Sequence, residues 1–92
     1  MRVEDAIWSF VKRLYQGWLS DGARVHPSWT PAQMYRLYLR YLNALAKAGY
    51  PDPYDAVENL FEMADPSEDI QSFDRWARSI LESEYGVAVP KI

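Results

Sequence analysis

Three helix-start signals constrain the fold of this chain more than any other feature. Each places a capping side chain directly before a proline, in TPAQ from Thr30, DPYD from Asp52 and DPSE from Asp65. The oxygen of an Asp or Thr side chain accepts a hydrogen bond from the open N–H groups of the first helical turn. Proline at the first helical position lacks an N–H that would otherwise be unpaired. A helix is therefore predicted to begin at the proline of each signal.

Glycines mark the predicted helix ends. Gly22, Gly49 and Gly86 each follow a stretch with helical apolar periodicity, and glycine favours the left-handed conformation just beyond a helix. The connections are short, and Pro66 directly after the third helix forces a corner. We therefore expect an all-α fold, a compact four-helix bundle of the orthogonal type with a short extended C-terminal tail, in one domain over residues 1–92. The predicted helices cover about 3–20, 31–48, 53–64 and 66–85, and the tail covers 87–92.

The second predicted helix has an apolar arc of roughly 220°, at about 100° per residue. An arc this wide needs neighbours on two sides, so this helix is expected to be central. Its tyrosines are interpreted as core residues whose hydroxyls reach the edge of the core. The last predicted helix carries Asp74, Arg78 and Glu82 at a spacing of four residues. This charged ladder is expected to face solvent.

Two apolar sets have two interpretations each. An aromatic ridge beside the buried stripe of the first helix consists of Trp8, Tyr15 and Leu19. The ridge either extends the core or forms an exposed hot spot for a partner. In the tail, alternating apolar side chains are supplied by Val87, Val89 and Ile92. They either dock into a groove of the same bundle or add to a partner's sheet or groove.

Charge is divided unevenly between the two halves of the chain, although the net charge is only −3. Residues 1–49 hold seven cations and three acids, a net charge of +4, whereas residues 50–92 hold three cations and ten acids, a net charge of −7. The proposed acidic patch consists of Asp55, Glu58, Glu62, Asp65, Glu68 and Asp69. Some of these acids suit helix N-termini. The patch either keeps the protein in solution or docks a basic partner.

A basic line on the second helix is formed by Arg36, Arg40 and Lys47. This line makes nucleic-acid binding the first alternative to protein binding. The second and third helices also have a helix-turn-helix outline, but its reading helix would be acidic and would meet phosphates. The second helix would therefore be the reader, with Gln33 beside the arginines.

No motif for catalysis or for a cofactor is present. His26 is the only histidine and there is no cysteine, so a zinc site is not expected. Carboxylates are numerous, but they cluster at helix caps and on convex faces, where a hydrolase pocket is not expected. We therefore expect no enzyme, no metal and no cofactor. No stretch approaches 18 uninterrupted apolar residues, and acids precede the first apolar residues, so a soluble cytoplasmic chain is expected.

These observations favour a non-catalytic protein-interaction module that docks on a larger protein through charged and aromatic surfaces. In style the chain resembles the small acidic accessory proteins with which phages block host machinery, although no motif carries that likeness. An inhibitor of this kind would occupy a nucleic-acid-binding groove by charge mimicry. Nucleic-acid binding through the basic line is the first alternative. A self-assembling subunit, joined through the oppositely charged halves, is the second.

Overall fold

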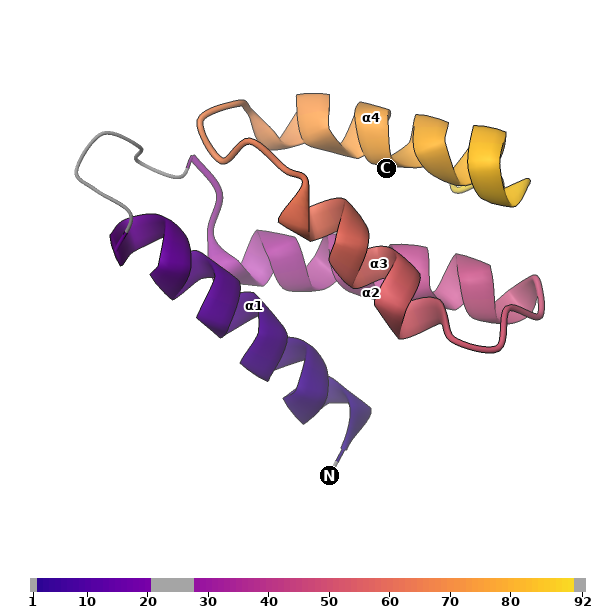
Figure 1. Ribbon diagram of the computed structural model, residues 1–92, viewed down its shortest axis with the longest axis horizontal. Helices are drawn as coiled ribbons and strands as arrows, with labels where there is room; N and C mark the ends of the chain where they lie inside the picture. The colour runs from indigo at the N-terminus through magenta and orange to yellow at the C-terminus, as the bar shows by residue number, and fades with distance from the viewer. Residues whose placement is uncertain (1, 21–27, 91–92) are drawn as a thin grey trace.

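A computed structural model describes residues 2–20 and 28–90 of the chain (Figure 1). This part contains four helices and no strand, which confirms the predicted all-α class and the helical bundle. The helices are α1 (Val3–Ser20), α2 (Pro31–Lys47), α3 (Pro53–Glu62) and α4 (Ile70–Tyr85). The predicted stop at Gly22 lies outside the described residues.

The capping chemistry fixes the ends of α2 and the start of α3 as the sequence indicates. Thr30 and Gln33 form a reciprocal capping box at the start of α2. Gly49 follows α2 with φ +89°, and the Tyr50 N–H donates to the carbonyl of Leu45, as in a Schellman motif. Asp52 caps α3 by accepting from the Asp55 N–H. Both helices end slightly earlier than predicted, at 47 and 62, because Ala48 and Met63 are their C-cap residues.

The start of α4 corrects the sequence prediction. The helix begins at Ile70 and not at Pro66, because Asp69 is the residue that caps it, accepting from the Ser72 N–H at 2.8 Å. The Asp65 carboxylate instead closes a local turn, in which it accepts from the N–H and the hydroxyl of Ser67. Asp65 and Asp69 both carry a side-chain oxygen suited to a helix cap, and a short sequence pattern does not decide which of them caps α4.

α2 is the central helix, packed against both α1 and α3 (Figure 1). In this view α1 crosses α2 obliquely, and α4 lies on the opposite side of α2 from α1. The core is an aromatic cluster around Phe61, whose ring centroid lies 5.0 Å from Phe73, 5.9 Å from Tyr38 and 6.3 Å from Tyr41. Rings of this size let a short chain bury a large apolar area per residue.

The outer parts of the chain differ in their packing. α1 buries Ile7, Phe10 and Val11, whereas Val3 is 46% exposed because the N-terminal end of α1 extends away from the other helices (Figure 1). Beyond α4 the chain turns back at Gly86, which has φ +66°. Val87 and Val89 are both buried, so this segment docks on its own bundle. Ile92 lies outside the described residues.

Candidate functional site

A groove of about 540 Å³ opens between α2 and α4. Leu37 and Ile70 supply its apolar lining, and three arginines stand around them. Arg36 comes from α2, and Arg75 and Arg78 come from α4. We call this site the arginine groove. It joins residues that are about 40 positions apart in the chain and gathers positive charge in a concave surface.

The loops that precede α2 and α4 hold the two helix starts together. The Glu68 carbonyl accepts from the Ser28 hydroxyl at 2.8 Å and from the Trp29 indole N–H at 2.7 Å. The Ser28 N–H also donates to the carbonyl of Pro66. Trp29 is fully buried and packs against Phe73 of α4 at 4.9 Å. These contacts bring the first turns of α2 and α4 to the same end of the groove.

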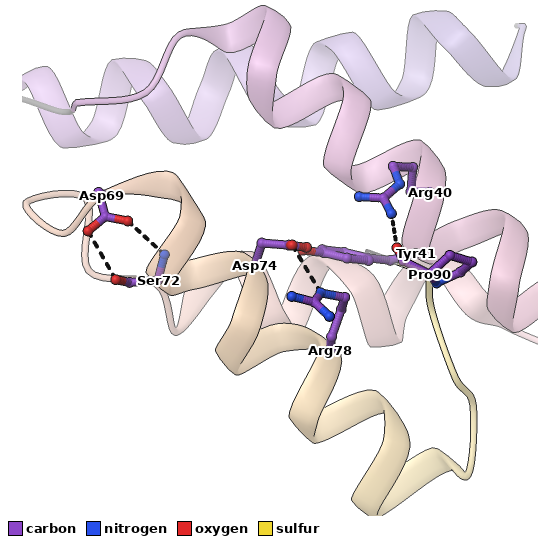
Figure 2. Close-up of polar contacts among 7 residues, drawn as sticks. All are labelled: Arg40, Tyr41, Asp69, Ser72, Asp74, Arg78 and Pro90. Atoms are coloured by element: carbon purple, nitrogen blue, oxygen red, sulfur yellow. Dashed lines mark hydrogen bonds and ion pairs between the residues drawn. The ribbon is translucent and has the colours of Figure 1, made fainter. Parts of the chain in front are cut away.

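Asp74 anchors the wall of the groove that α4 supplies. Its carboxylate accepts from the Tyr41 hydroxyl of α2 and from Arg78 Nε at 3.0 Å (Figure 2). Asp74 is only 8% exposed, so the predicted solvent-facing ladder is wrong at this position. A buried carboxylate needs such partners, because its desolvation is otherwise costly. Burial, and then the hydrogen bond to Asp74, raises the pKa of the Tyr41 hydroxyl, which therefore stays a proton donor at neutral pH.

The groove keeps a positive surplus after this internal pairing. Its lining holds three cations and one acid, and Asp74 is the ion-pair partner of Arg78. Arg75 donates only to the Ser72 hydroxyl, at 3.3 Å, and Arg36 makes no hydrogen bond or ion pair with the described residues. Gln33 and Gln71 add amide donors from the first turns of their helices, where the helix dipole also favours an anion. The arrangement suits a negatively charged guest that also has an apolar part.

The basic line predicted on α2 is divided by the fold. Arg36 joins the arginine groove, and Lys47 is exposed in the last turn of α2. Arg40 is half-buried and donates to the carbonyl of Pro90 in the C-terminal segment (Figure 2). Arg75 and Arg78 were not among the predicted site residues. Their spacing of three residues on α4 was visible in the sequence, but the nearness of α4 to Arg36 was not.

Several residues of the proposed acidic patch make hydrogen bonds that stabilise the fold. The Glu58 carboxylate is half-buried and accepts from the Tyr38 hydroxyl at 3.0 Å. Hydrogen bonds from Ser67 lower the pKa of the Asp65 carboxyl, and hydrogen bonds from Ser72 lower that of Asp69. The remaining members of the patch, all exposed, are Asp55, Glu62 and Glu68. Capping and turn bonds therefore account for part of this charge.

The predicted aromatic ridge is only partly exposed. Trp8 is half-buried and stacks on Tyr35 of α2, with ring centroids 4.5 Å apart and planes inclined by 14°. Tyr15 is half-buried, and Leu19 is 45% exposed. At its Trp8 end the ridge therefore extends the contact between α1 and α2, and its opposite end faces solvent.

Comparison of the chain with protein-family models, with curated proteins and with solved structures gives no match. Residues 2–20 and 28–90 contain no group of three His, Cys, Asp or Glu side chains placed to hold a metal ion. In the same ranges no helix combines the length and the apolar character needed to cross a membrane. His26, the histidine weighed as a metal ligand, lies outside the part that the structure describes.

Proposed function

We propose that this protein is a non-catalytic interaction module that binds an acidic, partly apolar segment of a larger protein in the arginine groove. One observation carries the proposal, namely that Arg36, Arg75 and Arg78 stand around an apolar lining with only one carboxylate among them. Guanidinium groups pair with carboxylates through two parallel hydrogen bonds, which favours Asp and Glu side chains in the guest. Leu37 and Ile70 provide the contact for an apolar side chain between those acids.

The composition of the groove favours a protein guest over a nucleic acid. Proteins that hold single strands combine cations with aromatic side chains on which bases stack, and no aromatic residue lines this groove. Arg40, which the nucleic-acid hypothesis needs, is held by Pro90. Asp65, Glu68 and Asp69 precede the first turn of α4 and would repel a phosphate backbone that extended beyond the groove.

The same lining argues against catalysis at this site. Asp74 is the only carboxylate that the described residues place in the lining, and its oxygens already accept from Tyr41 and Arg78. The Tyr41 hydroxyl has a raised pKa, which makes it a poor general base. Among the described residues no second acid, histidine or cysteine stands in the lining. The groove therefore supports binding through preformed charge, without a proton-transfer pair.

Selection from a displayed library of short random peptides tests the proposal. The wild-type protein is the bait, and the variant Arg36→Glu/Arg75→Glu is the counter-selection bait. We expect enriched peptides to carry several Asp or Glu residues with one or two large apolar residues between them. Fluorescence anisotropy should show that the double reversal weakens their binding about tenfold or more, with strong dependence on salt.

A matched control separates the groove from overall charge. Arg2→Glu/Arg13→Glu changes the net charge by the same amount through two exposed arginines of the α1 region, outside the groove. This control should bind the selected peptides within about twofold of the wild type. Equal loss in both variants would contradict the proposal. DNA or RNA oligonucleotides that bind at low salt and lose binding in Arg36→Glu/Arg75→Glu, when no peptide is enriched, would favour the nucleic-acid hypothesis instead.

A further inference from the structure

A second groove, of about 350 Å³, lies on the other side of α4, between α4 and α3. Its apolar lining includes Leu60 of α3, Met63 directly after α3, and Trp76 and Ile80 of α4. Leu60 is buried, Trp76 and Ile80 are half-buried, and Met63 is 71% exposed. We call this site the methionine groove. Met63 therefore adds an exposed apolar side chain to the edge of this hollow.

The rim of the methionine groove is acidic on both sides. Glu62 stands on the α3 side and Glu84 on the α4 side, and both are exposed. Among the described residues no Lys or Arg lines the groove, so none of them places a cation beside either acid there. The arginine groove has the reverse arrangement. Charge complementarity therefore defines the flanks of a guest that would fit between the two acids.

We propose that the methionine groove binds an amphipathic helix of a partner protein, with an apolar stripe flanked by Lys or Arg. The apolar wall residues stand three apart at the end of α3 and four apart on α4, so the apolar part of each wall spans about one helical turn. A guest helix with apolar residues at the same spacing can place them between these walls. Met63 suits such contact because its unbranched thioether adapts to different neighbours.

The acidic rim also disfavours two other guests for this groove. A membrane surface carries anionic lipids, which Glu62 and Glu84 would repel. An acidic peptide of the kind proposed for the arginine groove would be repelled in the same way. The second-groove proposal does not depend on the first, because the two sites use different residues and guests of opposite charge.

Methyl NMR of the full chain tests this proposal. The probes are a helical peptide of leucines at helical spacing with flanking lysines, and the same peptide with glutamates in place of the lysines. The Met63 methyl signal reports the groove, and the Met34 methyl, which is fully buried, reports the core. We expect the lysine peptide to shift the Met63 signal saturably and to leave Met34 nearly unchanged, and the glutamate peptide to shift neither.

Charge reversal with a matched control completes the test. Glu62→Lys/Glu84→Lys should weaken the lysine peptide about tenfold or more. Asp55→Lys/Glu82→Lys makes the same charge change on exposed residues of α3 and α4 outside the groove, and should weaken it less than about threefold. Equal weakening in both variants, or a Met63 shift with the glutamate peptide, would overturn the proposal. A Met63 signal that moves on dilution of the protein alone would also overturn it, in favour of self-association.

Discussion

The two sides of α4 differ in charge although they belong to the same helix. The side that faces α2 presents Arg75 and Arg78 to the arginine groove, whereas the side that faces α3 presents Trp76, Ile80 and Glu84 to the methionine groove. Residues that are neighbours in the chain, such as Arg75 and Trp76, therefore line different sites. The net charge of −3 conceals this division, because opposite charges gather on opposite sides of one helix.

The two sides also differ in how they hold α4 to the bundle. On the α2 side a polar anchor joins Asp74 to Tyr41, while rings make the contact in the centre, where Phe73 lies 5.0 Å from Phe61. A polar anchor fixes orientation through the direction of its hydrogen bonds, whereas ring packing supplies most of the buried area. The comparison therefore predicts that core changes affect both grooves and that changes at Asp74 affect mainly one.

Of the predicted changes, replacement of Phe61 by Ala should have the largest effect on the stability of the protein. Phe61 is fully buried in contact with rings from α1, α2 and α4, and loss of such a ring costs about 3–5 kcal/mol of unfolding free energy. Urea denaturation followed by circular dichroism measures this loss. Peptide binding should weaken in both grooves together. As a control, Leu19→Ala at a half-exposed position should cost less than about 0.5 kcal/mol.

Changes at Asp74 should affect the arginine groove more than the methionine groove. They should also cost less unfolding free energy than the loss of the Phe61 ring. Asp74→Ala leaves the Tyr41 hydroxyl and Arg78 without their acceptor, and should cost about 2–3 kcal/mol of unfolding free energy. Asp74→Asn keeps an acceptor for Tyr41 and removes the negative charge from the arginine groove. It should therefore bind acidic peptides roughly 2–5-fold more tightly, measured by fluorescence anisotropy. Unchanged affinity for acidic peptides, or an equal change in the affinity of the methionine groove for its own peptide, would contradict the prediction that Asp74 affects mainly the arginine groove.

The smallest effect concerns pH and the first turn of α4. Hydrogen bonds from Ser72 lower the pKa of the Asp69 carboxyl below its value in the unfolded chain, near 4. The carboxylate therefore contributes stability above about pH 4, and this contribution is lost as pH falls through the lowered pKa. Asp69→Asn can still cap the helix, but its contribution should not titrate.

Urea midpoints between about pH 2 and 7 check this prediction. The difference in stability between the wild type and Asp69→Asn should shrink as pH falls below about 4. A constant difference across the pH range would mean that the charge of Asp69 does not contribute to the cap.

Local chemistry in the sequence was sufficient for the four helices, apart from the start of α4. The Thr30 and Asp52 caps and the Gly49 stop were predicted from nearest neighbours, because capping uses atoms only a few residues away. The central position of α2 followed from the width of its apolar arc, and its buried face confirms this. The start of α4 was predicted wrongly for a local reason, since both Asp65 and Asp69 offer a capping oxygen.

Only the tertiary structure decided which charged side chains share a site. It brought Arg36 beside Arg75 and Arg78, joined Arg40 to the Pro90 carbonyl by a hydrogen bond, and buried Asp74 against Tyr41. Helical periodicity gives the face on which a residue lies, but it does not say which helix that face meets. That choice depends on the contacts of Trp29 and Glu68, which align α2 with α4 across about 40 residues of chain. The sequence by itself therefore determined the helices, and long-range packing determined the two grooves.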